Sequence, residues 1–128
     1  MSEPAERTDA VRVVIADDDP DIRVLLRSIL DLDHRITVAG EASDGQEALS
    51  RFDELRPDVL VLDERMPRLY GLEVARRVLR EHPEQPVILC TAYVDDAVLA
   101  TASELGVQCV LGKGDIHNLG NEILRLVS

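Results

Sequence analysis

The sequence passes from an apolar run into three consecutive aspartates and a proline over residues 11–20, VRVVIADDDP. Val11–Ala16 is rich in β-branched residues and has the length of a buried strand. Asp19 followed by Pro20 is typical of a helix N-cap and the first helical position. The stretch therefore predicts a strand that ends in carboxylates and leads directly into a helix.

The rest of the chain repeats this pattern of a strand and then a helix. Further strands are predicted at Ile36–Gly40, Val59–Leu62, Val87–Cys90 and Val107–Leu111. Apolar residues recur with helical spacing at Ile22, Leu25, Leu26 and Ile29, at Leu72, Ala75, Val78 and Leu79, and at Ile116, Leu119, Ile123 and Leu126. Weaker helices are expected at about residues 46–55, after an Asp44–Glu47 capping box, and 95–105, ended by Gly106. Because parallel strands need crossover connections, the alternation predicts an α/β fold, a doubly wound parallel sheet of five strands with five helices.

Composition fits one compact domain without a nucleic-acid or membrane partner. The 128 residues are 45% hydrophobic and 30% charged, which is enough for one buried core. A net charge of −11 repels phosphate backbones and argues against direct nucleic-acid binding. No apolar run approaches the roughly 20 residues of a membrane helix, and no signal peptide is evident, so we expect a cytoplasmic protein. The domain is expected over residues 11–128, after a flexible tail at residues 1–10.

The cysteines and histidines give no sign of a disulfide or a metal site. Cys90 and Cys109 lie in apolar runs without CxxC spacing and are expected to be reduced core residues. His34, His82 and His117 are scattered and lack metal-ligand spacing, so we expect them at the surface.

Polar side chains gather where the predicted strands end. Asp17 and Asp18 follow the first strand, Asp63 the third, Thr91 the fourth and Lys113 the fifth. Ligand sites of open α/β sheets lie outside the carboxyl ends of the strands, so these side chains are expected to meet. Each residue alone has a plain structural explanation as a cap or loop residue, but the joint pattern does not.

The chemistry of these side chains favours magnesium and a phosphoryl group. Neighbouring carboxylates repel one another unless a hard cation lies between them, and Mg²⁺ takes one or two carboxylates together with waters and phosphate oxygens. Lys113 and the Thr91 hydroxyl suit phosphoryl oxygens. Asp63 is a carboxylate at neutral pH and could attack phosphorus without a neighbouring base. The product would be an aspartyl phosphate.

Taken together, these residues resemble the receiver domains of two-component response regulators over about residues 11–127. The resemblance rests on ADDDP at 16–20, LDERMP at 62–67 followed by Gly71, Thr91-Ala92 and Lys113, in matching order and spacing. It implies a flavodoxin-like strand order, 2-1-3-4-5. It also implies that Asp63 is the phosphoacceptor and that Thr91 and Lys113 bind the phosphoryl group. The Mg²⁺ ligands that it implies are Asp17, Asp18, Asp63 and the backbone carbonyl of Arg65.

The resemblance implies a signalling switch and not an enzyme with a separate substrate. Its phosphoryl donor would be a sensor histidine kinase or a small molecule such as acetyl phosphate, and its readout a downstream protein target or output domain. Partner contacts, and a homodimer if one forms, are expected on the fourth helix, fifth strand and fifth helix, because Thr91 and Lys113 flank that face. The alternative is the receiver half of a longer transcriptional regulator whose helix-turn-helix output domain is missing from this chain.

Two positions depart from the pattern of many such domains. Val110 stands three residues before the lysine, where an aromatic residue is common, and Gly114 follows the lysine in place of a cis proline. An aromatic switch is therefore not expected, and the loop before the last helix should be looser.

Three other functional classes fit the residues less well. A haloacid dehalogenase-type hydrolase needs an acid two residues after its nucleophile, where Arg65 stands and stays protonated. A nucleotide- or flavin-binding module would cradle phosphate in a glycine-rich loop, whereas residues 17–21 would repel it. A receiver that has lost phosphorylation is disfavoured because all the key residues are present.

Overall fold

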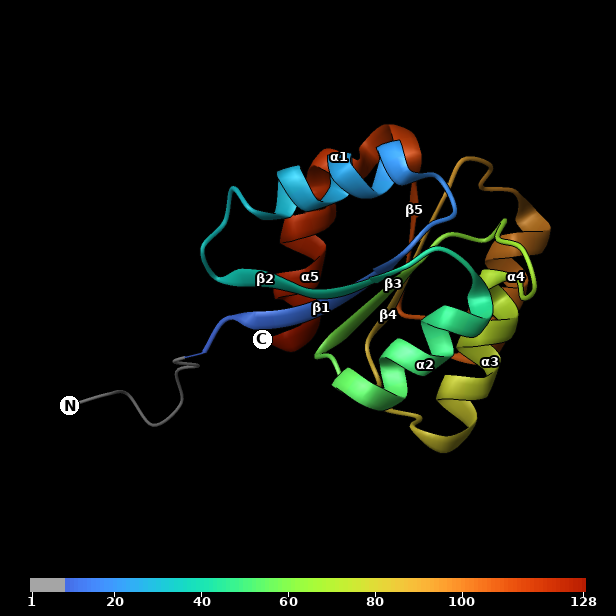
Figure 1. Cartoon of the computed structure of the whole chain (residues 1–128). Helices are drawn as coiled ribbons and strands as arrows, with labels where there is room; N and C mark the ends of the chain where they lie inside the picture. The colour runs from blue at the N-terminus through green and yellow to red at the C-terminus, as the bar shows by residue number, and fades with distance from the viewer. Residues whose placement is uncertain (1–8) are drawn as a thin grey trace.

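A computed structural model describes residues 9–128 and shows five strands alternating with helices (Figure 1). Most of the tail expected at residues 1–10 lies outside the described residues. The strands are β1 (Val11–Ala16), β2 (Ile36–Ala42), β3 (Val59–Leu62), β4 (Val87–Thr91) and β5 (Cys109–Gly112). The helices are α1 (Pro20–Leu30), α2 (Gly45–Leu55), α3 (Gly71–Glu81), α4 (Asp96–Leu105) and α5 (Leu119–Val127), with a 3₁₀ helix, η1 (Lys113–Asn118), before α5.

All neighbouring strands pair in parallel, in the order β2-β1-β3-β4-β5. The doubly wound sheet and its strand order are therefore confirmed. From β1 the chain first adds β2 on one side of the sheet and then crosses to the other side of β1 to add β3, β4 and β5 in turn. The direction in which strands are added therefore changes between the neighbouring strands β1 and β3. In open α/β sheets this switch point is where a crevice opens at the carboxyl ends of the strands.

The helices cover both faces of the sheet, with α1 and α5 on one face and α2, α3 and α4 on the other (Figure 1). Alternate residues of β1 enter the two cores: Val13 and Ile15 pack on the α1–α5 side, and Val14 and Ala16 on the opposite side. Such strands are apolar on both faces, which is why they read as continuous hydrophobic runs. No helix in the described range is long and apolar enough to cross a membrane.

The expected helix caps form, with one shift in register. Asp19 accepts a hydrogen bond from the backbone N–H of Asp21, and Gly106 ends α4 with a φ of 91°. Asp44 Oδ1 accepts from the backbone N–H of Glu47 at 2.8 Å. Glu47 in turn accepts from the backbone N–H of Ser43, one residue earlier than in a standard capping box.

Several predicted boundaries were wrong for identifiable reasons. β2 continues to Ala42 because a bulge between the Val13 and Val14 pairs carries the ladder on to the Ala16–Ala42 pair. β5 begins only at Cys109, since the side chain of Gln108 bonds Val87 N and Gln85 O. Three further local expectations were wrong. Asp95 is the N-cap of α4 and not its first residue, and Ile116 lies in η1 and not in the last α-helix. Leu25, expected on the apolar face of its helix, is 44% exposed.

The cysteines and one histidine also differ from expectation. Cys90 is a core residue, but Cys109 is only half-buried, with Sγ 3.6 Å from a Glu122 oxygen. Burial raises the pKa of Cys90 to about 12 and that of Cys109 to about 11, so both remain thiols at neutral pH. His34 and His117 are exposed as predicted, whereas His82 is half-buried with its ring 5.4 Å from that of Phe52.

Candidate functional site

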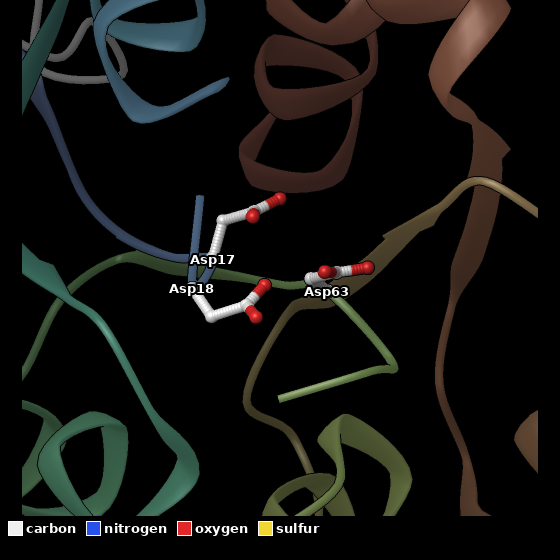
Figure 2. Close-up of side chains that lie close together, drawn as sticks. All are labelled: Asp17, Asp18 and Asp63. Carbon is white, nitrogen blue, oxygen red and sulfur yellow. The ribbon is translucent and has the colours of Figure 1, made fainter. Parts of the chain in front are cut away.

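Three carboxylates meet where β1 and β3 end side by side (Figure 2). Asp17 and Asp18 follow β1 and Asp63 follows β3, and one oxygen from each lies within 4.8 Å of the others. Asp17 is 1% and Asp63 5% exposed, whereas Asp18 lies at the surface. The structure therefore brings the three aspartates of the sequence into one cluster, open to solvent on the Asp18 side.

Lys113 reaches this cluster from the end of β5. Its Nζ lies 2.9 Å from Asp17 Oδ2 and 3.2 Å from Asp63 Oδ2. Burial by itself lowers the pKa of Lys113, but the contacts with Asp17 and Asp63 outweigh burial, so the pKa is raised overall. The lysine is therefore charged at neutral pH and bridges the two buried acids.

The environment of Asp63 disfavours its ionised form. Burial raises the pKa of Asp63, and the negative charge of Asp17 raises it further. Lys113 offsets only part of this effect. A cation placed among the carboxylates would relieve the remaining cost.

Asp17 is held through all of its polar groups. Its N–H donates to Ala42 O at 3.0 Å, and its carbonyl accepts from Arg23 Nη1 at 2.6 Å. Its Oδ1 accepts from Asp19 N at 2.9 Å, while Oδ2 contacts Lys113. The turn that carries Asp17 and Asp18 is thus fixed by β2, α1 and Lys113 together.

The loop after Asp63 is locked to the start of α3. Gly71 N–H donates to Glu64 O at 2.9 Å, and Leu72 N–H donates to Glu64 Oε1 at 2.8 Å. A Cβ at Gly71 would collide with the carbonyl oxygen of Asp63, so this close approach requires glycine. Glu64 and Arg23 are contributors that the sequence analysis missed, because neither follows a recognisable local spacing.

Thr91 ends β4, the strand next to β3, and Arg65 and Tyr93 lie in the loops that follow β3 and β4. Thr91, the last residue of β4, is 3% exposed and pairs with Gly112 of β5. Within the described residues, the Thr91 hydroxyl makes no hydrogen bond to another residue. Every fully buried side-chain oxygen in this part of the chain has a hydrogen-bond partner. The Thr91 hydroxyl is therefore not fully buried and is in contact with solvent. Arg65 and Tyr93 line one hollow beside Ala92, Val94 and Asp95, and Tyr93 is 73% exposed.

The donor set of the cluster fits a hard divalent cation. All three side chains offer carboxylate oxygens, the ligands that Mg²⁺ prefers. Ligand oxygens around one octahedral Mg²⁺ lie about 3 to 4 Å apart, close to the spacing of this cluster.

Comparison with known proteins places these residues within one family. The sequence matches the response regulator receiver domain family over residues 13–123. Protein-glutamate methylesterase/protein-glutamine glutaminase 1 of Syntrophus aciditrophicus is 40% identical over 108 residues, which are 83% of this chain and 31% of that protein. Protein CcdB of Bacillus subtilis is 39% identical over 95 residues, 74% of this chain and 78% of that protein. Response regulator GacA of Pseudomonas viridiflava is 34% identical over 105 residues, 81% of this chain and 49% of that protein.

Solved structures agree with the sequence match. The signal receiver domain of NarL from Mycobacterium tuberculosis superposes with a TM-score of 0.88 at 32% identity, covering 93% of this chain and 97% of that chain. The response regulator domain of Thermotoga maritima CheB gives 0.81 at 28% identity, covering 92% and 93%. The family match spans all the strand-end residues described above, and this chain belongs to the receiver domains of two-component response regulators.

Proposed function

We propose that this receiver accepts a phosphoryl group on Asp63 in a Mg²⁺-dependent reaction and thereby switches a protein-interaction surface. The phosphoryl donor is a sensor histidine kinase or a small acyl phosphate. The observation that carries the proposal is the position of Asp63, beside two further carboxylates and 3.2 Å from the Lys113 ammonium.

The proposed reaction is an in-line displacement at phosphorus. A carboxylate oxygen of Asp63 forms the new P–O bond, while the bond from phosphorus to the histidine nitrogen, or to the acetate oxygen of acetyl phosphate, breaks. The bonding electron pair leaves with the nitrogen or the acetate. Asp63 needs no general base because its ionised form is itself the nucleophile.

The remaining residues stabilise charge on the transferred group. Asp17, Asp18, Asp63 and the Arg65 backbone carbonyl would hold Mg²⁺, which neutralises negative charge on the phosphoryl oxygens. Lys113 would donate to one phosphoryl oxygen and the unpaired Thr91 hydroxyl to another. Arg65, two residues after the nucleophile, cannot act as the general acid of a dehalogenase-type hydrolase.

The switched surface is proposed to be the face of α4, β5 and α5. Ala102 is the one buried residue of α4, and Leu99 on that helix is 44% exposed. A hollow lined by Leu99, Ala102, Gly106, Val107 and Val110, among others, runs between α4 and β5. Thr91 and Lys113 border this face through β4 and β5, so a change at the site has a short path to it.

Two arrangements of the output remain as proposals. A single-domain regulator that acts by protein contact is supported by CcdB, of which the matched region makes up 78%. The receiver half of a longer transcriptional regulator is the alternative; GacA, of which the matched region makes up 49%, supports a longer chain. An immunoblot of the protein in its own cells separates them, because the alternative requires a band well above the size of 128 residues. In both cases we propose a cytoplasmic location, which suits two reduced thiols.

The direct test is phosphoryl transfer from acetyl phosphate with and without Mg²⁺. We expect incorporation only when Mg²⁺ is present and release of the label by hydroxylamine, which cleaves acyl phosphates. Equal incorporation in the presence of excess EDTA, or a label that resists hydroxylamine, would contradict the proposed reaction.

A further inference from the structure

The backbone carbonyl of Asp17 has an unusual partner in the side chain of Arg23 on α1. Arg23 Nη1 lies 2.6 Å from this oxygen. The oxygen belongs to the planar peptide group that links Asp17 to Asp18, so a hydrogen bond to it fixes the plane of that group. Asp18 is exposed and makes no side-chain hydrogen bond within residues 9–128, so its direction depends on this backbone.

Arg23 is itself oriented by Glu41 of β2. Arg23 Nε donates to Glu41 Oε1 at 3.2 Å, and the other carboxylate oxygen accepts from Arg27 Nε at 2.7 Å. The side chains of Arg23 and Glu41 are 19% and 31% exposed, so this contact is partly shielded from water. Ala42, the next residue of β2, accepts the N–H of Asp17. Two consecutive residues of β2 therefore hold both ends of the Asp17 backbone, one directly and one through Arg23.

We propose that Arg23 is a positioning residue of the metal site. Its guanidinium, aligned by Glu41, fixes the Asp17–Asp18 peptide so that Asp18 joins Asp17 and Asp63 as a third ligand group. This inference rests on the proposed function, because it requires the aspartate cluster to bind Mg²⁺.

The positioning effect and the charge of Arg23 act in opposite directions on Mg²⁺ affinity. A positive charge near the cluster repels the ion, so removal of the charge alone would tighten binding. Removal of an outer-sphere partner that orients metal ligands typically weakens metal binding by about 10- to 100-fold. The sign of the change in Kd therefore separates the two roles.

The experiment measures the Kd for Mg²⁺ alone by isothermal titration calorimetry, at a temperature where circular dichroism shows every variant to be folded. Arg23→Gln should weaken Mg²⁺ binding by about tenfold or more. Arg23→Lys should weaken Mg²⁺ binding as well. The ammonium group keeps the positive charge, but it cannot reproduce the planar guanidinium that bonds Asp17 O and Glu41 at the same time. Arg27→Gln is the matched control. Arg27 lies on the same helix and also bonds Glu41, so its substitution removes the same charge but leaves the hydrogen bond from Arg23 to Asp17 O in place. Its affinity should be unchanged or tighter.

A second readout needs no metal. The backbone amide resonance of Asp18 should shift in metal-free Arg23→Lys but not in Arg27→Gln. Mg²⁺ binding by both Arg23 variants as tight as that of the parent would overturn the inference while leaving the proposed function intact. A parent protein that does not bind Mg²⁺ at all would instead overturn the proposed function and this inference with it. Should Arg23→Gln not fold, Arg23→Lys decides the question alone.

Discussion

The ammonium nitrogen of Lys113 lies 3.2 Å from an oxygen of Asp63, although the two residues follow strands that are separated by β4. Lys113 therefore reaches across the end of β4 to a carboxylate that is 5% exposed. This contact partly offsets the effects of burial and of Asp17, which raise the pKa of Asp63. The surroundings of Asp63, the proposed nucleophile, thus make its ionised form costly.

Asp63→Asn should make the metal-free protein more stable at neutral pH. The pKa of Asp63 is raised above its ordinary value of 3.8, so the folded state binds the Asp63 proton more tightly than the unfolded state does. This contribution to parent stability is present below pH 3.8 and is lost as the pH rises through the folded-state pKa. The advantage of Asp63→Asn in urea unfolding should therefore grow from pH 3.5 toward pH 7. Asp53→Asn, at an exposed position outside the cluster, should show no such trend, and a large loss of stability in Asp63→Asn would give Asp63 a structural role.

Mg²⁺ should stabilise the folded parent protein, and Asp18→Ala should abolish the effect. A ligand that binds only the folded state adds about 2.7 kcal/mol at a hundredfold excess over its Kd. Asp18 is exposed, so its removal should change the metal-free melting temperature little. Asp21→Ala, an exposed acid in the first turn of α1, should retain the full Mg²⁺ shift. A parent melting temperature that ignores millimolar Mg²⁺ would mean that the carboxylates do not form a metal site.

Phosphorylation should leave the region around Val110 without a rotating aromatic side chain. Val110 is half-buried in β5, and Tyr93 is 73% exposed on the loop after Thr91. We expect structures with and without beryllofluoride to differ mainly in that loop, as Thr91 moves toward the phosphoryl mimic. Movement of Tyr93 into the space beside Val110 would show that another aromatic residue has taken over the switch.

Beryllofluoride should change amide hydrogen exchange mainly in α4, β5 and α5. These elements border Thr91 and Lys113, and α4 has little of its surface in the core. Leu99→Asp should weaken any self-association that beryllofluoride induces, whereas Val24→Asp, at an exposed aliphatic position on α1, should not. Changes in exchange confined to α1 and α2 would contradict this assignment of the switched face.

Sequence patterns predicted the elements whose signals are local. Five apolar runs gave the strands, and parallel pairing then brought Asp17, Asp18 and Asp63 together, because the carboxyl ends of such strands share one edge. The extension of β2 could not be predicted, since the bulge that carries it depends on pairing with β1. The burial of His82 against Phe52 likewise depends on a contact between residues 30 positions apart in sequence.

The supporting contacts of the site escaped the sequence for the same reason. In the sequence Glu64 looks like an ordinary charged loop residue; only the folded chain places the Leu72 backbone nitrogen 2.8 Å from its carboxylate. Arg23 reads as one charged residue of an amphipathic helix until Glu41 and the Asp17 carbonyl are brought beside it. Contacts between residues far apart in the sequence have no fixed spacing, so a sequence pattern cannot predict them.

Intact-mass spectrometry of the parent and of Asp63→Asn, after incubation with acetyl phosphate and Mg²⁺, tests most directly whether Asp63 is the sole phosphoacceptor. Asparagine keeps the shape of the side chain but removes the nucleophilic oxygen and its charge. We expect one phosphoryl adduct on the parent and none on Asp63→Asn, with Asp53→Asn labelled like the parent. An adduct of equal yield on Asp63→Asn would place the chemistry on another residue and rule out Asp63 as the sole phosphoacceptor.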